Sequence, residues 1–479
     1  MKYETLLEGL DIAEVKFTDI GLSNSIFRFD SEFFNKECEQ IDKHIYAIPH
    51  MFLDKKRIVS GPFGSSLKSD NYLKNGIPFI RIENIKGGFD IDNTELIYIS
   101  EQNHKRLSNS ALTINDLILS KVGNSIGYFA RVDESINECN ISENNIGIKL
   151  YGIPDVRKHY ILTYLNSRYA NRLVLRRRSG NAQPKLNVGD LTYIPIPLFS
   201  SVFEAQVSRL VLLSKEAINQ SKRIYRDAER ILINELQFID WQMPTHTHST
   251  KKISESFFLT GRLDAEYYQP KYDEMFDKLK HYKTKCLSEI VSITKSIEPG
   301  SDAYEEKGIP FIRVANLTKF GITNTDIYLS PERYNDVIKP KKDTILLSKD
   351  GSVGIAYKVD RDMDIITSGA ILHLSLTDPE IMPDYLTLVL NSIIVKMQAE
   401  RDAGGSVIQH WKPSEIENVI IPILDMDIQK EITNKIRNSF TLRSESKYMQ
   451  DIAKYAVEIA IDQGEDKAIE FLKSKCDRK

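Results

Sequence analysis

The sequence predicts an α+β fold with two tandem repeats of a small α/β domain, each followed by a long helix, the two helices pairing as an antiparallel coiled coil. Three observations predict it: an internal repeat, short apolar runs separated by Gly, Asn and Asp turns, and two long stretches of heptad periodicity. At 479 residues the chain exceeds one ordinary core. Its 41% hydrophobic and 27% charged residues are typical of folded, soluble proteins.

The repeat is clearest at Gly76-Ile77-Pro78-Phe79-Ile80-Arg81, which recurs as Gly308-Ile309-Pro310-Phe311-Ile312-Arg313. The offset is 308 − 76 = 232, and Asn84 and Asn316 keep it. Other matches follow in the same order: Arg28-x-Asp30-x-Glu32 with Arg262-x-Asp264-x-Glu266, Leu119-Ser120-Lys121 with Leu347-Ser348-Lys349, Leu165-Asn166-Ser167 with Leu390-Asn391-Ser392, Ile196-Pro197 with Ile421-Pro422, and Gln206 with Gln429. Two copies of one unit therefore cover nearly the whole chain.

Each copy is followed by a long helical pattern. From Val207 to Leu232, apolar or small residues recur at alternating steps of three and four, and a similar trend runs from Ile428 to Ala460 before Gly464. Seams of this length usually have a helical partner, so we expect the two helices to pack on one another. The alternative, in which each helix only covers its own domain, stays open.

Composition excludes several other classes of protein. No apolar run approaches the roughly 20 residues that a membrane helix needs, and the first residues lack the apolar core of a signal peptide, so we expect a cytoplasmic protein. Cys38, Cys139, Cys286 and Cys476 are scattered, and the His246-Thr247-His248 linker lacks nearby Cys, Asp or Glu. We therefore predict no metal site, no disulfide and no cofactor. With a net charge of −3, any DNA binding must use local basic patches.

The ordered motifs, found twice, resemble those of the specificity subunits of type I restriction-modification enzymes. The resemblance implies a non-catalytic DNA reader with target-recognition domains at residues 1–200 and 246–425, a conserved spacer helix with a linker at 201–245, and a second spacer helix at 426–479. Each domain of such a subunit reads one half of a split, asymmetric DNA site. The implied partners are double-stranded DNA, two methyltransferase subunits and a nuclease-translocase subunit. Residues 1–27 have no counterpart in the second copy.

Candidate DNA contacts lie where basic, amide and glycine residues coincide, because phosphates need positive charge and base edges need paired donors or acceptors. The best segments are 176–185 and 401–412, and the next are 120–125 and 348–352; Gly61–Lys68 resembles a phosphate-binding loop in composition. The predicted contact residues are Lys68, Lys121, Asn124, Arg176, Arg177, Arg178, Ser179, Gln183, Lys185, Lys349, Ser352, Arg401, Ser406, Gln409, His410 and Lys412.

Plainer interpretations exist for these segments. A basic helix end is favourable without any ligand, and Gly with Asn or Ser is the usual composition of a turn. For Arg81 and Arg313 a structural ion pair is at least as good an explanation as a DNA contact.

A catalytic function is the competing class. The chain has no Pro-Pro, which the Asn- or Asp-Pro-Pro-aromatic motif of a DNA methyltransferase requires. Pro154-Asp155 and Pro383-Asp384 lack the acidic partner of a nuclease metal site. A further alternative is a specificity subunit that serves another restriction type, whose nuclease and methyltransferase share one polypeptide.

Overall fold

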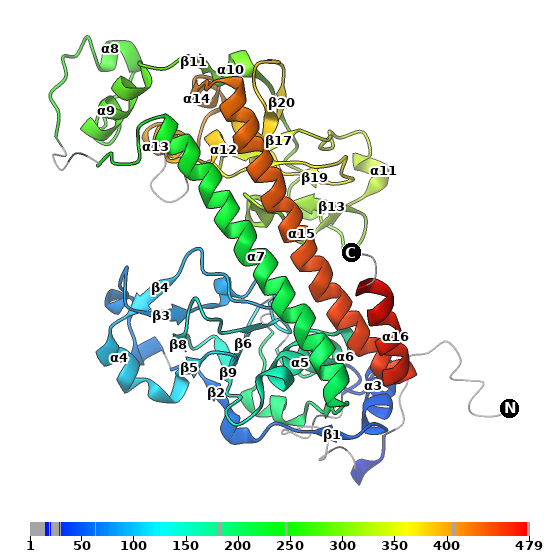
Figure 1. The fold of residues 1–479 in the computed structure, drawn as a ribbon. Helices are drawn as coiled ribbons and strands as arrows, with labels where there is room; N and C mark the ends of the chain where they lie inside the picture. The colour runs from blue at the N-terminus through cyan, green and yellow to red at the C-terminus, as the bar shows by residue number, and fades with distance from the viewer. Residues whose placement is uncertain are drawn as a thin grey trace. The chain divides into compact units, whose positions relative to one another are not determined.

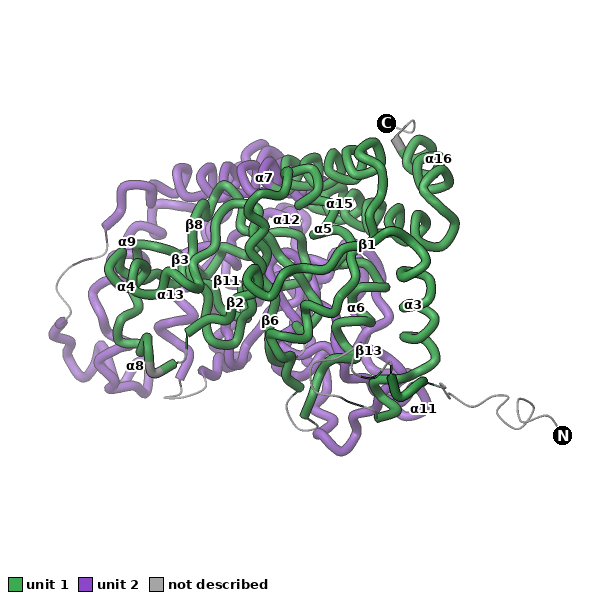
Figure 2. The backbone as a smooth tube through the Cα atoms, turned by 90° about the horizontal axis from the view of Figure 1, so that it is seen from below, with its two compact units in different colours: residues 1–218, 443–479 green, residues 219–442 purple. Residues whose placement is uncertain are grey.

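The computed structural model describes residues 15–18, 20, 28, 30–62, 64–123, 125–180, 184–242, 244, 248–404 and 409–476 (Figure 1). The chain forms two compact units (Figure 2): unit 1 is Met1–Ile218 with Arg443–Lys479, and unit 2 is Asn219–Leu442. Both boundaries fall inside long helices, α7 (Ser201–Glu235) and α15 (Met426–Gln463). They differ from the predicted boundaries at 200, 245 and 425, because each part of a long helix makes its contacts with a different unit.

In the part of unit 1 that the structure describes, two sheets have four strands each and a third has two. The strand orders are β2 (Ile58–Ser60), β9 (Asn145–Ile148), β6 (Leu117–Ser120), β7 (Phe129–Arg131); β4 (Ile97–Ile99), β3 (Ile77–Ile80), β8 (Glu138–Ile141), β5 (Leu112–Thr113); and β1 (His50–Met51) with β10 (Ile196–Pro197). Besides parts of α7 and α15, its helices are α3 (Lys36–Tyr46), α4 (Glu101–Arg106), α5 (Asp155–Leu165), α6 (Arg168–Leu175) and α16 (Glu465–Cys476).

Unit 2 is built on the same plan. Its strand orders are β12 (Val291–Lys295), β20 (Ile371–Leu376), β17 (Ile345–Ser348), β18 (Ala356–Lys358); β16 (Tyr328–Leu329), β13 (Ile309–Ile312), β19 (Ile366–Thr367); β14 (Leu317–Thr318) with β15 (Gly321–Ile322); and β11 (Thr284–Cys286) with β21 (Ile420–Pro422). Its helices are α8 (Phe257–Thr260), α9 (Pro270–Leu279), α10 (Leu287–Ile290), α11 (Pro331–Tyr334), α12 (Pro383–Leu390), α13 (Ile393–Asp402) and α14 (Pro413–Glu417).

The two units share a mixed sheet, in which one strand has both a parallel and an antiparallel neighbour. In each unit the strand of the Gly-Ile-Pro-Phe-Ile-Arg motif has an antiparallel neighbour on one side and a parallel neighbour on the other. Phe79 of β3 pairs with Asn140 of β8, and Phe311 of β13 pairs with Ile366 of β19. The prediction of a mixed helix-and-sheet fold is confirmed, and the repeated motifs occupy matching places in it.

The repeated glycine begins this strand for a steric reason. Gly76 and Gly308 both have φ of +139°, a conformation that side chains rarely adopt. A Cβ added at Gly76 would lie 2.5 Å from the carbonyl oxygen of Ile99, and one at Gly308 would lie 2.3 Å from that of Leu329. The neighbouring antiparallel strand therefore requires glycine at both positions.

The asparagine of Leu-Asn-Ser joins a helix to a sheet in each unit. The side chain of Asn166 accepts from the backbone N–H of Phe129 (3.1 Å) and donates to its carbonyl (2.9 Å). Asn391 makes the same two hydrogen bonds with Ala356, at 3.2 and 2.7 Å. An amide side chain is long enough to pair with a strand edge as another strand would. The motif therefore docks α5 on β7 and α12 on β18.

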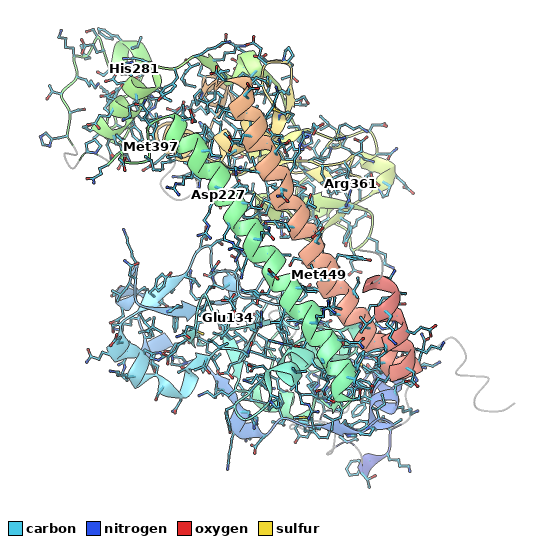
Figure 3. The ribbon with its side chains drawn as sticks, viewed as in Figure 1. Glu134, Asp227, His281, Arg361, Met397 and Met449 are labelled. Atoms are coloured by element: carbon cyan, nitrogen blue, oxygen red, sulfur yellow. The ribbon has the colours of Figure 1, made fainter. Side chains whose placement is uncertain are left out.

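Within each unit, α7 and α15 contact each other through small residues. In unit 1 the hydroxyls of Ser214 and Ser446 are 2.9 Å apart, and Ser200, just before α7, donates its N–H to Glu465 (2.9 Å), which begins α16 directly after the end of α15. Partner numbers thus fall as α7 advances, so the segments are antiparallel. In unit 2 the hydroxyls of Ser221 and Ser439 are also 2.9 Å apart. All four of these serines are buried. In Figure 3, the labels Asp227 and Met449 mark α7 and α15.

Replacing either repeated glycine with alanine should destabilise the protein. We expect Gly76→Ala and Gly308→Ala each to lower the free energy of unfolding by about 1–3 kcal/mol, because the added Cβ meets a carbonyl oxygen and the backbone is strained. Urea unfolding measures this loss. Gly189→Ala is the matched control, since a Cβ there meets nothing within 4 Å. Equal stability of all three variants would contradict the steric explanation.

Two buried histidines should make stability depend on pH. Arg131 donates to Nε2 of His159 (3.0 Å), and burial with this guanidinium lowers the pKa of His159 to about 4. Burial likewise lowers the pKa of His373 to about 4. The unfolded chain, in which a histidine has an ordinary pKa near 6.5, therefore binds more protons between these values.

The free energy of unfolding should thus be highest above pH 6.5, where both histidines are neutral, and should fall as the pH is lowered toward 4. The loss should be on the order of 3 kcal/mol for each histidine. Urea unfolding at a series of pH values measures it. A His159→Gln/His373→Gln variant should show a flatter slope between pH 6.5 and 5, and an unchanged slope would refute this cause.

Candidate nucleic-acid interface

In unit 1 the structure brings together two segments that the sequence singled out separately. After α6, Ser179 forms a β-bridge with Lys185, and Lys185 forms another with Val122, just past β6. The backbone N–H of Leu186 donates to the carbonyl of Lys121 (2.9 Å). We call residues 120–123, 178–180 and 184–185 the first loop pair; Asn181–Gln183 and Asn124 lie outside the described residues.

Unit 2 repeats this arrangement bond for bond. His410 bridges to Gly404 after α13 and to Asp350 after β17, and the N–H of Trp411 donates to the carbonyl of Lys349 (2.8 Å). Position 410 thus corresponds to 185, and position 350 to 122. We call residues 348–352, 404 and 409–412 the second loop pair; residues 405–408 lie outside the described residues.

The Arg-x-Asp motif holds each loop pair at the end of its helix. Arg28 is bidentate to Asp30 (2.7 and 2.8 Å) and donates to the carbonyl of Arg176 (3.2 Å), which caps α6, and to that of Arg178 (2.6 Å) in the turn that follows. Arg262 is bidentate to Asp264 (2.9 and 2.6 Å) and donates to the carbonyl of Asp402 (2.9 Å). The last carbonyls of a helix have no partner within it, so a charged donor stabilises them.

The carboxylates of this motif belong to the clamp. The hydrogen bond from Arg28 lowers the pKa of Asp30, and that from Arg262 lowers the pKa of Asp264. Both aspartates therefore stay ionised at neutral pH as partners of their arginines.

Arg176 and Arg177 were predicted to contact DNA, and the structure corrects this. Both are buried: Arg176 forms a 2.6 Å ion pair with Asp42, and Arg177 donates to the carbonyls of Leu173 (2.7 Å) and Tyr193 (3.0 Å). Burial lowers the pKa of Arg177 to about 10. Both guanidinium groups also lie over the ring of Phe33. These two arginines therefore hold the helix end in place and do not face a ligand.

The remaining cations of the first loop pair lie at the surface. Arg178 and Lys185 are exposed, Lys121 is half-buried, and Ser179 between them is half-buried. Among the described residues, no carboxylate lies within ion-pair distance of Lys121, Arg178 or Lys185. This loop pair therefore presents positive charge that is not neutralised by its surroundings.

The basic side chains at and beside the second loop pair have acidic partners. Lys349 pairs with Asp350, His410 lies 2.9 Å from the same carboxylate, and Lys412 lies 3.5 Å from Glu415. Arg401 pairs with Asp402 (2.7 Å) and stacks on Tyr267 and Phe276, which gives it a packing role instead of the predicted contact. Ser352 and Gln409 are exposed.

The loop Gly61–Lys68 holds one of the chain's own acids. The N–H of Gly64 donates to the carboxylate of Glu143 (2.6 Å). This backbone donor, which a phosphate would need, therefore already has a partner within the chain. Lys68 is exposed. Arg81 forms a 2.6 Å ion pair with Glu83, in accord with the structural interpretation.

Three other predicted residues, Asn124, Gln183 and Ser406, lie outside the described residues. The sequence interpretation missed the roles of Glu143 and Asp350. For Asp350 the two copies do differ visibly, because Lys-Val in the first copy is Lys-Asp in the second.

No group of three or more His, Cys, Asp or Glu side chains in the described part of the chain could hold a metal ion. His248 of the linker is exposed, and His246 lies outside that part. None of the helices described is both long and apolar enough to cross a membrane.

Alanine substitutions at two adjacent arginines just after α6 should have different effects on the free energy of unfolding. We expect Arg177→Ala to lower the free energy of unfolding by on the order of 3 kcal/mol, because two buried carbonyls lose their donor. Arg178→Ala should change it by about 0.5 kcal/mol or less, since the side chain is exposed. Urea unfolding of both variants measures the difference, and similar values would show that the burial of Arg177 is unimportant for stability.

Residues 280–446, most of which lie in unit 2, match the family model described as "Type I restriction modification DNA specificity domain". Comparison with curated proteins found no match.

Three solved structures are similar to the chain. The S subunit of the type I restriction-modification system from M. genitalium is 13% identical over 89% of this chain and 96% of that one, with a TM-score of 0.34. The HsdS subunit from Thermoanaerobacter tengcongensis is 14% identical over 88% and 96%, with a TM-score of 0.28. A chain from a study of complex assembly and conformational transition of the type I R-M system is 13% identical over 87% and 98%, also at 0.28.

All three TM-scores are below 0.5, so these structures carry no argument about this chain. The sequence match shows that residues 280–446 are similar to the type I restriction modification DNA specificity domain.

Proposed function

We propose that this chain is the DNA-sequence-specificity subunit of a type I restriction-modification system. It reads a bipartite, asymmetric DNA site with two target-recognition domains, at residues 1–200 and 246–425. It carries out no chemistry itself, and it positions two methyltransferase subunits and a nuclease-translocase subunit. Its expected place of action is the cytoplasm.

The observation that carries the proposal is the family match in unit 2 together with the shared plan of unit 1. Residues 1–200 lie outside the matched segment. They nevertheless have a four-stranded sheet of matching order, the same mixed pairing around the repeated motif strand, the same asparagine dock at Asn166 and the same arginine clamp at Arg28. A second DNA-specificity domain is the simplest explanation for so many shared contacts.

The long helices suit the role of a spacer. Two reading surfaces work on one duplex only at a set separation, because one face of the DNA recurs once per helical turn of about 34 Å. A helix of 35 residues such as α7 is about 50 Å long at 1.5 Å per residue. We propose that residues 201–245 and 426–479 form an antiparallel spacer that fixes this separation, and that the methyltransferase subunits dock on it.

We assign DNA contact to the predicted residues that the burial pattern leaves accessible. Side chains at the surface of the loop pairs can reach phosphates and base edges, whereas buried ones cannot. The set is Lys68, Lys121, Arg178, Ser179, Lys185, Lys349, Ser352, Gln409, His410 and Lys412, with Asn124, Gln183 and Ser406 kept from the sequence prediction.

A domain exchange tests this function. Replacing residues 1–200 by the matching half of a related chain, with α7 kept whole, should change one half of the recognised site and leave the other half unchanged. The readout is the map of methylated positions in DNA from cells that express the chimera with the methyltransferase subunit.

The reciprocal exchange of residues 246–425 is the control, and it should change the other half-site. If neither chimera changes the methylated sequence although both proteins are folded, the proposal is wrong.

A further inference from the structure

The two loop pairs share a backbone but differ in charge. In the first loop pair, Lys121, Arg178 and Lys185 have no carboxylate partner among the described residues. In the second, both lysines have a carboxylate partner: Asp350 pairs with Lys349 and lies 2.9 Å from His410, and Glu415 lies 3.5 Å from Lys412. The two loop pairs therefore differ in electrostatic balance on a shared backbone.

One substitution at an equivalent position produces the difference at the centre of the loop pairs. His410 corresponds to Lys185, so its bridge partner Asp350 corresponds to Val122, the partner of Lys185. The second loop pair thus has an acid where the first has an uncharged side chain.

Asp350 is held at the centre of the second loop pair. Its carboxylate contacts both Lys349 and His410, and its side chain is 21% exposed. The neighbouring N–H of Gly351 donates to the carbonyl of Gln409 (2.9 Å), which fixes this acid between the two loops. A phosphate that approaches Lys349 must therefore compete with a carboxylate that is already in place.

We propose that DNA binding by this chain is electrostatically one-sided: the first loop pair supplies the phosphate contacts, and Asp350 keeps the second loop pair compensated. The inference rests on the proposed function. Salt-dependent affinity arises when protein cations replace the counterions condensed on phosphates. A cation already neutralised within the protein contributes little to this exchange. Unit 1 therefore supplies most of the phosphate contacts that anchor the duplex.

The salt dependence of binding tests the proposal directly. The full chain and its variants are titrated onto a labelled random-sequence duplex at a series of KCl concentrations, and the slope of log Kd against log salt is compared. Lys121→Gln/Lys185→Gln should reduce the slope by roughly two, because each phosphate contact adds about 0.9. Lys349→Gln/Asp350→Asn removes a compensated pair and should leave the slope unchanged.

Removing the acid alone is the sharper arm of the test. Asp350→Asn should tighten binding and increase the slope by up to about one, because Lys349 becomes free to contact a phosphate. Asp362→Asn is the matched control, since Asp362 is an exposed carboxylate of the same unit that pairs with Lys341 (3.2 Å). Its slope should equal that of the wild type, and circular dichroism checks that all variants are folded.

Two results would overturn the inference. One is equal loss of slope in the Lys349→Gln/Asp350→Asn and Lys121→Gln/Lys185→Gln variants. The other is identical behaviour of Asp350→Asn and Asp362→Asn. Both leave the proposed function intact if the domain exchange still changes one half-site. A wild-type chain without salt-dependent DNA binding would overturn the inference and the proposed function together.

Discussion

The short antiparallel contact between the loop after each basic helix and the end of a central strand is the constraint on which the candidate interface depends. It joins Val122 to Lys185 in unit 1 and Asp350 to His410 in unit 2. Without it, the two segments would be unrelated surface turns. The clamps by Arg28 and Arg262 act on the same feature, because they fix the helix ends from which the loops leave. The framework and the candidate interface are therefore separate sets of residues within one unit.

This separation explains how the two units can share one architecture and still differ in the residues that lie between the framework positions. The asparagine docks, the required glycines and the arginine clamps are identical in the two units, so they specify the fold and carry no information about a ligand. The residues between them differ in charge, as Val122 and Asp350 illustrate. A protein built in this way can change what each half contacts without changing how each half folds. The asymmetry of the proposed DNA site follows from the same division.

The repeat was predictable from sequence because each of its motifs has a local backbone role that only one or two residue types can fill. Gly76 and Gly308 are required by a nearby carbonyl, and Asn166 and Asn391 by a strand edge. The burial of Arg176 and Arg177 beside an exposed Arg178 was not predictable from the sequence. Three consecutive arginines suggest one basic surface, but the helix turns the first two inward. Asp42, the partner of Arg176, lies 134 residues away in the chain, and no spacing rule indicates it.

The central claim is that two similar domains on one chain read two halves of a single DNA site at a fixed separation. The most direct measurement is the map of methylated bases in DNA from cells that express the unaltered chain with its methyltransferase subunit. We expect methylation within two short, different sequence elements that are separated by a constant number of unspecified base pairs. Methylation at one continuous sequence, or at two elements with variable spacing, would contradict it.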